Sequence, residues 1–257
     1  MKSKLLLSML VGASIALPAT ARAETLTIAT VNNPDMIVMQ KYSTKFEAQT
    51  GIKLKWLVLE ENVLRTRVTT DISTNGGQFD IITIGLFETP LWAKAGWLVP
   101  FDNLPASYDV GDVLEPIRNS LTYDGKLYSL PFYGESAMNY YRSDVFKKAG
   151  VTMPKQPTWD QIAEFADKVN DPGHGIYGVC LRGQPGWGEN MGFLGVVANS
   201  FGGQVFDANW KSGYTDPGWK KAANFYVKLM QKDGPPGAVG NGYNENLALF
   251  VSGHCAQ

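Results

Sequence analysis

Two segments of this sequence combine carboxylates with aromatic rings in settings rich in glycine. In residues 132–136, Glu135 follows Phe132 and Tyr133. Residues 182–190 form a glycine-rich loop that contains Arg182, Gln184, Trp187, Glu189 and Asn190. Charged side chains make strong hydrogen bonds to hydroxyl groups, amides both donate and accept, and aromatic rings cover C–H faces. These two segments are therefore candidate ligand-binding segments.

The glutamates of these two segments could also have a catalytic or a structural role. Glu135 and Glu189 could act as acid and base in glycoside hydrolysis, although no nucleophile or metal motif accompanies them. We therefore favour binding and keep a secreted carbohydrate-active hydrolase as the alternative. Glu135 could instead form a structural ion pair with Arg142. Trp187 has a glycine on each side, which favours an exposed ring over a packed one.

Three loops nearer the N-terminus supply further candidates, and each follows a predicted strand. They are residues 31–33, 60–62 and 85–88, with Asn32, Asn33, Glu61 and Phe87 as the candidate side chains. In a parallel sheet these loops lie at one edge, where ligands bind. A simpler interpretation is that Asn33 and Asn62 only cap helices and that the glutamates favour a first helical turn.

The N-terminal half alternates between the two periodicities that position these loops. Apolar residues of strand type occupy residues 26–30, 52–58 and 79–85, and helical spacing follows in residues 34–51, 64–76 and 90–96. Strands joined by crossover helices form a parallel sheet covered on both faces. We predict an α/β fold for this first lobe, residues 24–132.

The C-terminal half begins with a turn at Asp124-Gly125 and an extended aromatic run, which we interpret as a strand crossing to a second α/β lobe, residues 133–257. We predict a further strand at 176–181 and helices at 143–150, 158–170, 191–199, 217–233 and 245–252. Thr158 and Gln161 should form a capping box at the start of the second of these helices. The chain stops at Gln257, four residues after a helix-closing glycine, with no completing strand. We therefore expect the second lobe to be incomplete.

Residues 1–23 have the features of a cleavable signal peptide: two lysines, a short apolar run and Ala21-Arg22-Ala23. Removing them leaves 20 basic and 24 acidic residues, a net charge of −4 that argues against nucleic-acid binding. No later stretch approaches the about 20 apolar residues of a membrane helix. We expect an exported, soluble and periplasmic protein, and a monomer.

The two cysteines, Cys180 and Cys255, would reach an oxidising compartment, so a disulfide and two buried free thiols are both open. The two cysteines, with His174 and His254, give no pair at the spacing typical of metal ligands. We expect no metal site and no cofactor.

The chain resembles the extracellular solute-binding proteins of bacterial ABC importers, in the cluster that includes maltose-binding proteins. The similar segments are the signal peptide and residues 79–83, 96–100, 125–131, 139–142, 146–150 and 157–160. Residues 132–136 and 182–190 are similar to the sorbitol/mannitol (polyol) branch. The resemblance implies two α/β lobes of the type II arrangement, a ligand cleft at the hinge, closure on binding and a longer polypeptide with further crossings.

The resemblance also implies a role: capture of a polyol or small sugar and its delivery to membrane permease subunits. The ligand-binding residues would then be Asn32, Asn33, Glu61, Phe87, Tyr133, Glu135, Arg182, Gln184, Trp187, Glu189 and Asn190. A chemoreceptor-coupled or scaffolding protein of the same fold stays open as a third possibility.

Overall fold

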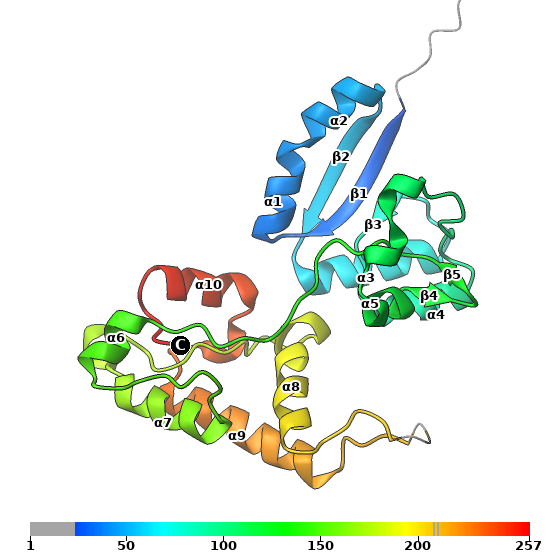
Figure 1. The fold of residues 1–257 in the computed structure, drawn as a ribbon. Helices are drawn as coiled ribbons and strands as arrows, with labels where there is room; N and C mark the ends of the chain where they lie inside the picture. Colours follow the sequence, from blue (N-terminus) through cyan, green and yellow to red (C-terminus); the bar gives the residue numbers. More distant parts are fainter. Residues whose placement is uncertain (1–23, 208, 210) are drawn as a thin grey trace, which may run out of the picture.

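The computed structural model describes residues 24–207, 209 and 211–257, so the predicted signal peptide lies outside the described residues. A parallel sheet of order β2-β1-β3 organises the first half (Figure 1). Its strands are β1 (Thr25–Val31), β2 (Lys53–Leu59) and β3 (Ile81–Ile82). β1 pairs with β2 along its whole length and with β3 at Ile28 and Ala29. The predicted parallel α/β sheet is confirmed.

β3 is shorter than the strand predicted over residues 79–85, because a side chain interrupts the ladder. The Thr27 N–H donates to Oδ2 of Asp80 at 2.7 Å, while backbone bonds join Asp80 N to Thr27 O and Thr83 N to Ala29 O. These bonds keep the segment beside β1. The loop after β3 therefore still begins at the same edge as the loops after β1 and β2.

Helices lie on both sides of this sheet, which the alternation of β1 requires. Ala29 and Val31 pack with α3 (Glu61–Ser73) and α4 (Glu88–Lys94) in a cluster that contains Leu64, Val68 and Trp92. On the other side, α1 (Pro34–Lys41) and α2 (Ser43–Thr50) run along β2 (Figure 1), and Trp56 Nε1 donates to Ser43 Oγ. The sheet is thus held between two layers of helices.

Capping residues in the sequence predicted most of the helix starts, and the structure corrects three of the predicted helices. Asn33 caps α1 by accepting from Met36 N–H, as predicted, but the predicted single helix 34–51 is two helices that meet at Tyr42. Glu60, and not Asn62, caps α3 by accepting from Val63 N–H. α4 begins at Glu88, two residues before the predicted start at residue 90.

Short elements complete the first part of the chain before the crossing segment. They are the 3₁₀ turns η1 (Ala106–Tyr108) and η2 (Val110–Asp112), the helix α5 (Glu115–Ser120) and the hairpin strands β4 (Thr122–Tyr123) and β5 (Lys126–Leu127). The hairpin turns at Asp124-Gly125, where both residues have positive φ, so the predicted turn is confirmed.

The second half is mainly helical (Figure 1). Its helices are α6 (Ser143–Lys148), α7 (Trp159–Val169), α8 (Gly192–Ser200), α9 (Pro217–Asp233) and α10 (Tyr243–Val251), with the short turns η3 (Pro172–His174), η4 (Trp187–Met191) and η5 (Ala238–Gly240). Thr158 and Gln161 form the predicted capping box of α7. The apolar faces of α7, α8 and α9 share one core, which includes Ala166, Val197 and Trp219. None of the helices described here has the length and hydrophobicity to span a membrane.

Two predicted strands are wrong in this half, because a strand needs a hydrogen-bonded neighbour along its length. Residues 129–142 cross between the lobes as extended chain, and their last residue donates to Ala256 O. Residues 176–181 share one isolated bridge with the C-terminal segment, between Tyr177 and Cys255, and Ile176 forms another with Asp171. The crossing segment is therefore a linker of extended backbone.

A disulfide between Cys180 and Cys255 fastens that C-terminal segment, with the two Cα atoms 5.9 Å apart. Cys180 N–H also donates to Gln257 O. The disulfide closes a loop with a sequence separation of 75 residues. It therefore joins the loop before η4 to the end of the described chain.

Replacing both cysteines by serine should lower the free energy of unfolding by about 2–4 kcal/mol, because the disulfide restricts the unfolded chain. Urea unfolding of the oxidised protein and of Cys180→Ser/Cys255→Ser measures this difference. As a control, a reductant should destabilise the wild type and leave the double variant unchanged. Equal stabilities of the oxidised wild type and the variant would contradict the stabilising role.

Candidate functional site

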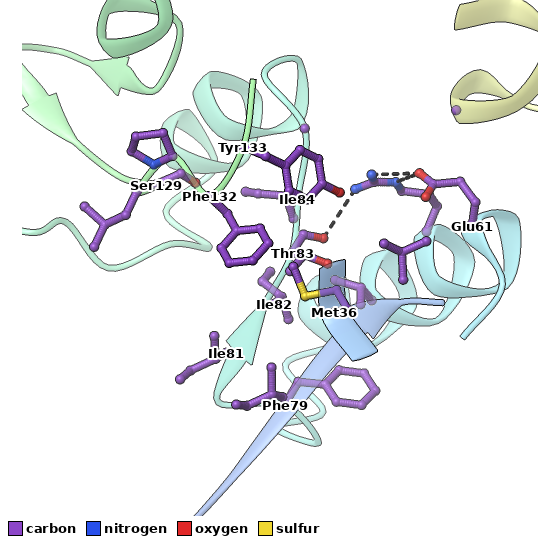
Figure 2. Close-up of a pocket in the computed structure, with 18 of the residues that line it drawn as sticks. Met36, Glu61, Phe79, Ile81, Ile82, Thr83, Ile84, Ser129, Phe132 and Tyr133 are labelled. Atoms are coloured by element: carbon purple, nitrogen blue, oxygen red, sulfur yellow. Dashed lines mark hydrogen bonds and ion pairs between the residues drawn. The ribbon is translucent and has the colours of Figure 1, made fainter. Parts of the chain in front are cut away.

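A cavity of about 1410 Å³ lies between the two lobes and extends along the sheet. Figure 2 shows part of its lining: Glu61 and Tyr133 lie at one end, and Phe79 and Ile81 lie at the other. The polar end receives the loops after β1, β2 and β3 from one side and the glycine-rich loop 182–190 from the other. This polar end is the candidate ligand site.

Nine of the eleven residues predicted from sequence line this cavity. They are Asn32, Asn33, Glu61, Phe87, Tyr133, Glu135, Arg182, Trp187 and Glu189. The parallel register of the three strands brings together the first four, which are far apart in the sequence. Whether these residues contact a ligand stays a prediction.

The other two residues, Gln184 and Asn190, lie outside the lining of this cavity. Gln184 Nε2 donates to Glu60 Oε1 at 3.1 Å, so its amide bridges the lobes. Asn190 Oδ1 accepts from the Gly186 N–H at 3.2 Å, and Asn190 lines a separate cavity of about 630 Å³. Both amides thus make contacts within the protein, Gln184 with the first lobe and Asn190 with the backbone of its own loop.

Arg65, which the sequence-based set missed, connects two of the loops at the polar end. Its guanidinium donates from Nε to Glu61 Oε1 and forms an ion pair with the same carboxylate, both at 2.8 Å. It also lies 3.9 Å from Glu88 Oε1 and donates to Thr83 O at 3.4 Å. The i to i+4 spacing of Glu61 and Arg65 on a predicted helix was the available signal.

Asn33 caps α1 and also lines the cavity, so the two interpretations of this residue are compatible. Its Oδ1 accepts from Met36 N–H at 2.9 Å while its Nδ2 donates to the Tyr133 hydroxyl at 3.2 Å. Burial, followed by the negative charge of Glu135, raises the pKa of Tyr133. The phenol therefore stays neutral and keeps a proton that it can donate to a ligand.

Glu135 is exposed in the crossing segment, and among the described residues it makes no hydrogen bond or ion pair. Arg142, its proposed structural partner, instead forms a two-pronged pair with Asp144, with Nη2 to Oδ2 at 2.7 Å and Nε to Oδ1 at 2.9 Å. The structural alternative for Glu135 is wrong. Its carboxylate is available to the cavity that it lines.

Trp187 reaches from the second lobe onto the first. Its ring is 49% exposed and packs edge-to-face on Phe87, with ring centroids 5.3 Å apart. The Arg65 guanidinium lies 6.0 Å from the same ring. The loop therefore presents an aromatic surface at the polar end, as its flanking glycines predicted.

Glu189 is only 5% exposed, and the protein provides its partners. Its Oε2 accepts from the Tyr243 N–H at 3.0 Å. Arg182 donates to Gly188 O at 2.7 Å and places its guanidinium 4.9 Å from the Tyr243 ring centroid. Burial raises the pKa of the Glu189 carboxyl, while the nearby Arg182 opposes the rise. A buried carboxylate held in this way is a rigid acceptor.

Tyr243 and Asn244 also line the cavity and were missed from sequence. They open α10, which begins two residues before the predicted start. Asn244 Nδ2 donates to Asn32 O at 3.3 Å across the cavity. The Gly242-Tyr243-Asn244 sequence before an apolar helical run was the signal that could have found them. No cluster of three or more metal-ligating side chains occurs among the residues with described positions.

The chain is similar to known proteins over most of its length. The family model described as bacterial extracellular solute-binding protein matches residues 33–257. The chain is 56% identical over 249 residues to the mannitol-binding protein of Pseudomonas aeruginosa, covering 96% of this chain and 57% of that protein.

Two solved structures of ABC transporter solute-binding proteins are also similar. One, from Agrobacterium vitis S4 with bound D-mannitol, is 57% identical with a TM-score of 0.87, and the match covers 91% of this chain and 57% of that chain. Another, from Agrobacterium radiobacter K84 in complex with ribitol, is 25% identical with a TM-score of 0.78 over 91% and 59% of the two chains. The chain thus spans a little more than half the length of these relatives.

Replacing Glu189 by glutamine should change how stability depends on pH. Because the pKa of Glu189 is raised in the folded chain, the buried carboxyl contributes full stability when it is protonated at low pH. That stability is lost as the pH rises above the ordinary carboxyl pKa of 4.5 and through the raised folded value. Wild type should therefore lose stability relative to Glu189→Gln with rising pH.

Urea unfolding at a series of pH values between about 4 and 8 measures this difference. Glu115→Gln, at the exposed start of α5, is the matched control and should show no such trend. A stability difference between wild type and Glu189→Gln that is constant over this range would contradict the raised pKa.

Proposed function

Because this chain belongs to the bacterial extracellular solute-binding proteins, we propose that it captures an acyclic polyol such as mannitol between its two lobes and delivers it to an ABC importer. The observation that supports this most strongly is the polar end of the cavity, where carboxylates, amides and an aromatic ring converge from both lobes. The mannitol-binding relative and the mannitol-bound structure support the same ligand class.

The charges that line the polar end suit a neutral ligand with many hydroxyl donors. The lining contains the carboxylates of Asp35, Glu60, Glu61, Glu135 and Glu189 against the guanidiniums of Arg65 and Arg182. Glu61 already pairs with Arg65. The remaining excess of acceptors favours hydroxyl groups and repels anionic sugar acids and sugar phosphates.

The aromatic and amide groups complete a site for a linear polyol. Trp187 and Phe87 together form an apolar corner that can cover C–H groups. Asn32 and Asn33 add groups that donate and accept, which match hydroxyls that do the same. A deoxy analogue would leave one of these groups unpaired at a cost of about 1–3 kcal/mol, so the site would discriminate by hydroxyl pattern.

Membership of an extracellular family and the features of residues 1–23 support secretion to the periplasm. The partners would be the polyol and the importer's membrane permease subunits. A monomer that binds without a cofactor is sufficient for this role. A hydrolase that uses Glu135 and Glu189 is disfavoured, because Glu189 is already committed to Tyr243 N–H.

Mannitol, sorbitol or arabitol should raise the melting temperature of the purified protein without being consumed. A polyol at 100 times its Kd would add about 2.7 kcal/mol of stability, because it binds only the folded state. Differential scanning fluorimetry measures the shift, and gluconate is the anionic control that should give none. No shift with any polyol or common sugar, or turnover of chromogenic glycosides, would count against the proposal.

Glu135→Ala should weaken polyol binding by about 10- to 100-fold, because the site loses a charge-assisted hydrogen bond. The melting temperature of the ligand-free protein should stay nearly unchanged, since the side chain is exposed and makes no hydrogen bond within the described chain. Titration calorimetry measures the affinity, and Glu115→Ala serves as an exposed control. A large loss of stability with unchanged affinity would make Glu135 a structural residue.

A further inference from the structure

The two lobes touch directly beside the candidate site, where loop 182–190 meets the first turn of α3. Asn62 Nδ2, on α3, donates to the Pro185 carbonyl at 3.2 Å, and Gln184 Nε2 donates to Glu60 Oε1 at 3.1 Å. In Figure 1 the segment before α8 reaches the start of α3. Asn62, Pro185 and Gly186 do not line the cavity. This contact therefore lies next to the ligand site and outside it.

Two glycines of the loop lie where an added side chain would collide with side chains of the first lobe. A Cβ atom on Gly186 would lie 3.0 Å from both Cγ and Nδ2 of Asn62 and still closer to Oδ1. A Cβ atom on Gly188 would lie 2.7 Å from Cγ of Glu61, whose carboxylate Arg65 holds in place. Gly186 has φ 161 and ψ 155, an extended backbone that any residue adopts. Its missing side chain therefore matters for the approach of the lobes.

The contact is made of neutral donors. Gln184 and Asn62 donate through amides, and every ion pair found among the described residues joins two groups of the same lobe. Hydrogen bonds that side-chain amides make at an exposed rim are readily replaced by hydrogen bonds to water. Such a contact can form and break without removing a pair of charges from solvent, which suits a reversible closure.

We infer that the approach of Gly186 to Asn62 is the closing contact of the cleft and sets polyol affinity although neither residue touches the ligand. This inference rests on the proposed function for its effect on affinity. The affinity observed for a ligand that needs the closed form is its intrinsic affinity reduced by the fraction of closed molecules. A methyl group on Gly186 must either displace the Asn62 amide or separate the lobes, and both lower that fraction.

The distance between the lobes tests the closing contact without any ligand. Nitroxide labels on Lys55→Cys in β2 and Lys228→Cys in α9, both exposed positions, report it by electron–electron double resonance. Gly186→Ala should lengthen and broaden the distance distribution. Gly195→Ala is the matched control, since a Cβ atom there has nothing within 4 Å, and it should match wild type.

Binding of mannitol and a double variant complete the test. Gly186→Ala should weaken binding about ten-fold, mainly through faster dissociation, whereas Gly195→Ala should leave it unchanged. Adding Asn62→Ala to Gly186→Ala removes the clashing amide and should restore part of the wild-type distance, which a simple loss of folding would not.

The two proposals can fail separately. Identical distance distributions for wild type and Gly186→Ala overturn the closing contact, whatever the affinity for mannitol. If the distances change as expected but wild type binds no polyol, the closing contact is supported and the proposed function is overturned.

Discussion

The parallel pairing of β1 with both β2 and β3 is the constraint on which the rest of the structure depends. It brings the loops after three strands to one edge, although they are separated by whole crossover helices. Asn33, Glu61 and Phe87 then face one cavity from a single rigid support. Arg65 strengthens this support by joining the carboxylates of two loops. The first lobe thus presents a preorganised half of the site.

The second lobe contributes through a loop instead of a strand edge, so other interactions must hold its side chains. The disulfide between Cys180 and Cys255 holds the chain just before loop 182–190. At the other end of this loop, Glu189 accepts a hydrogen bond from the first residue of α10. Arg182, at the start of the loop, stacks on Tyr243 and so connects the start of the loop to α10 as well. The rigidity that a sheet supplies in one lobe comes in the other from a covalent bond and a buried carboxylate.

Local sequence was a good guide wherever a feature depends on neighbours in the chain. The Asn33 cap, the Thr158 capping box and the turn at Asp124-Gly125 all formed where the residues predicted them. The errors occurred where the outcome depends on distant partners. Residues 129–142 and 176–181 have strand-like composition, yet they lack a continuous neighbouring strand in the described chain and remain extended segments.

The sequence by itself determined the fold class, the alternation of strands and helices and most of the residue types of the candidate site. Only the tertiary structure decided which of those side chains share a cavity. In the structure, Gln184 and Asn190 lie outside the cavity lining, whereas Arg65 and Tyr243 lie within it. Arg142 pairs with Asp144, which leaves the Glu135 carboxylate available to the cavity. The physical reason is that periodicity and caps are local properties, whereas the direction of a loop side chain depends on contacts with residues far away in the sequence.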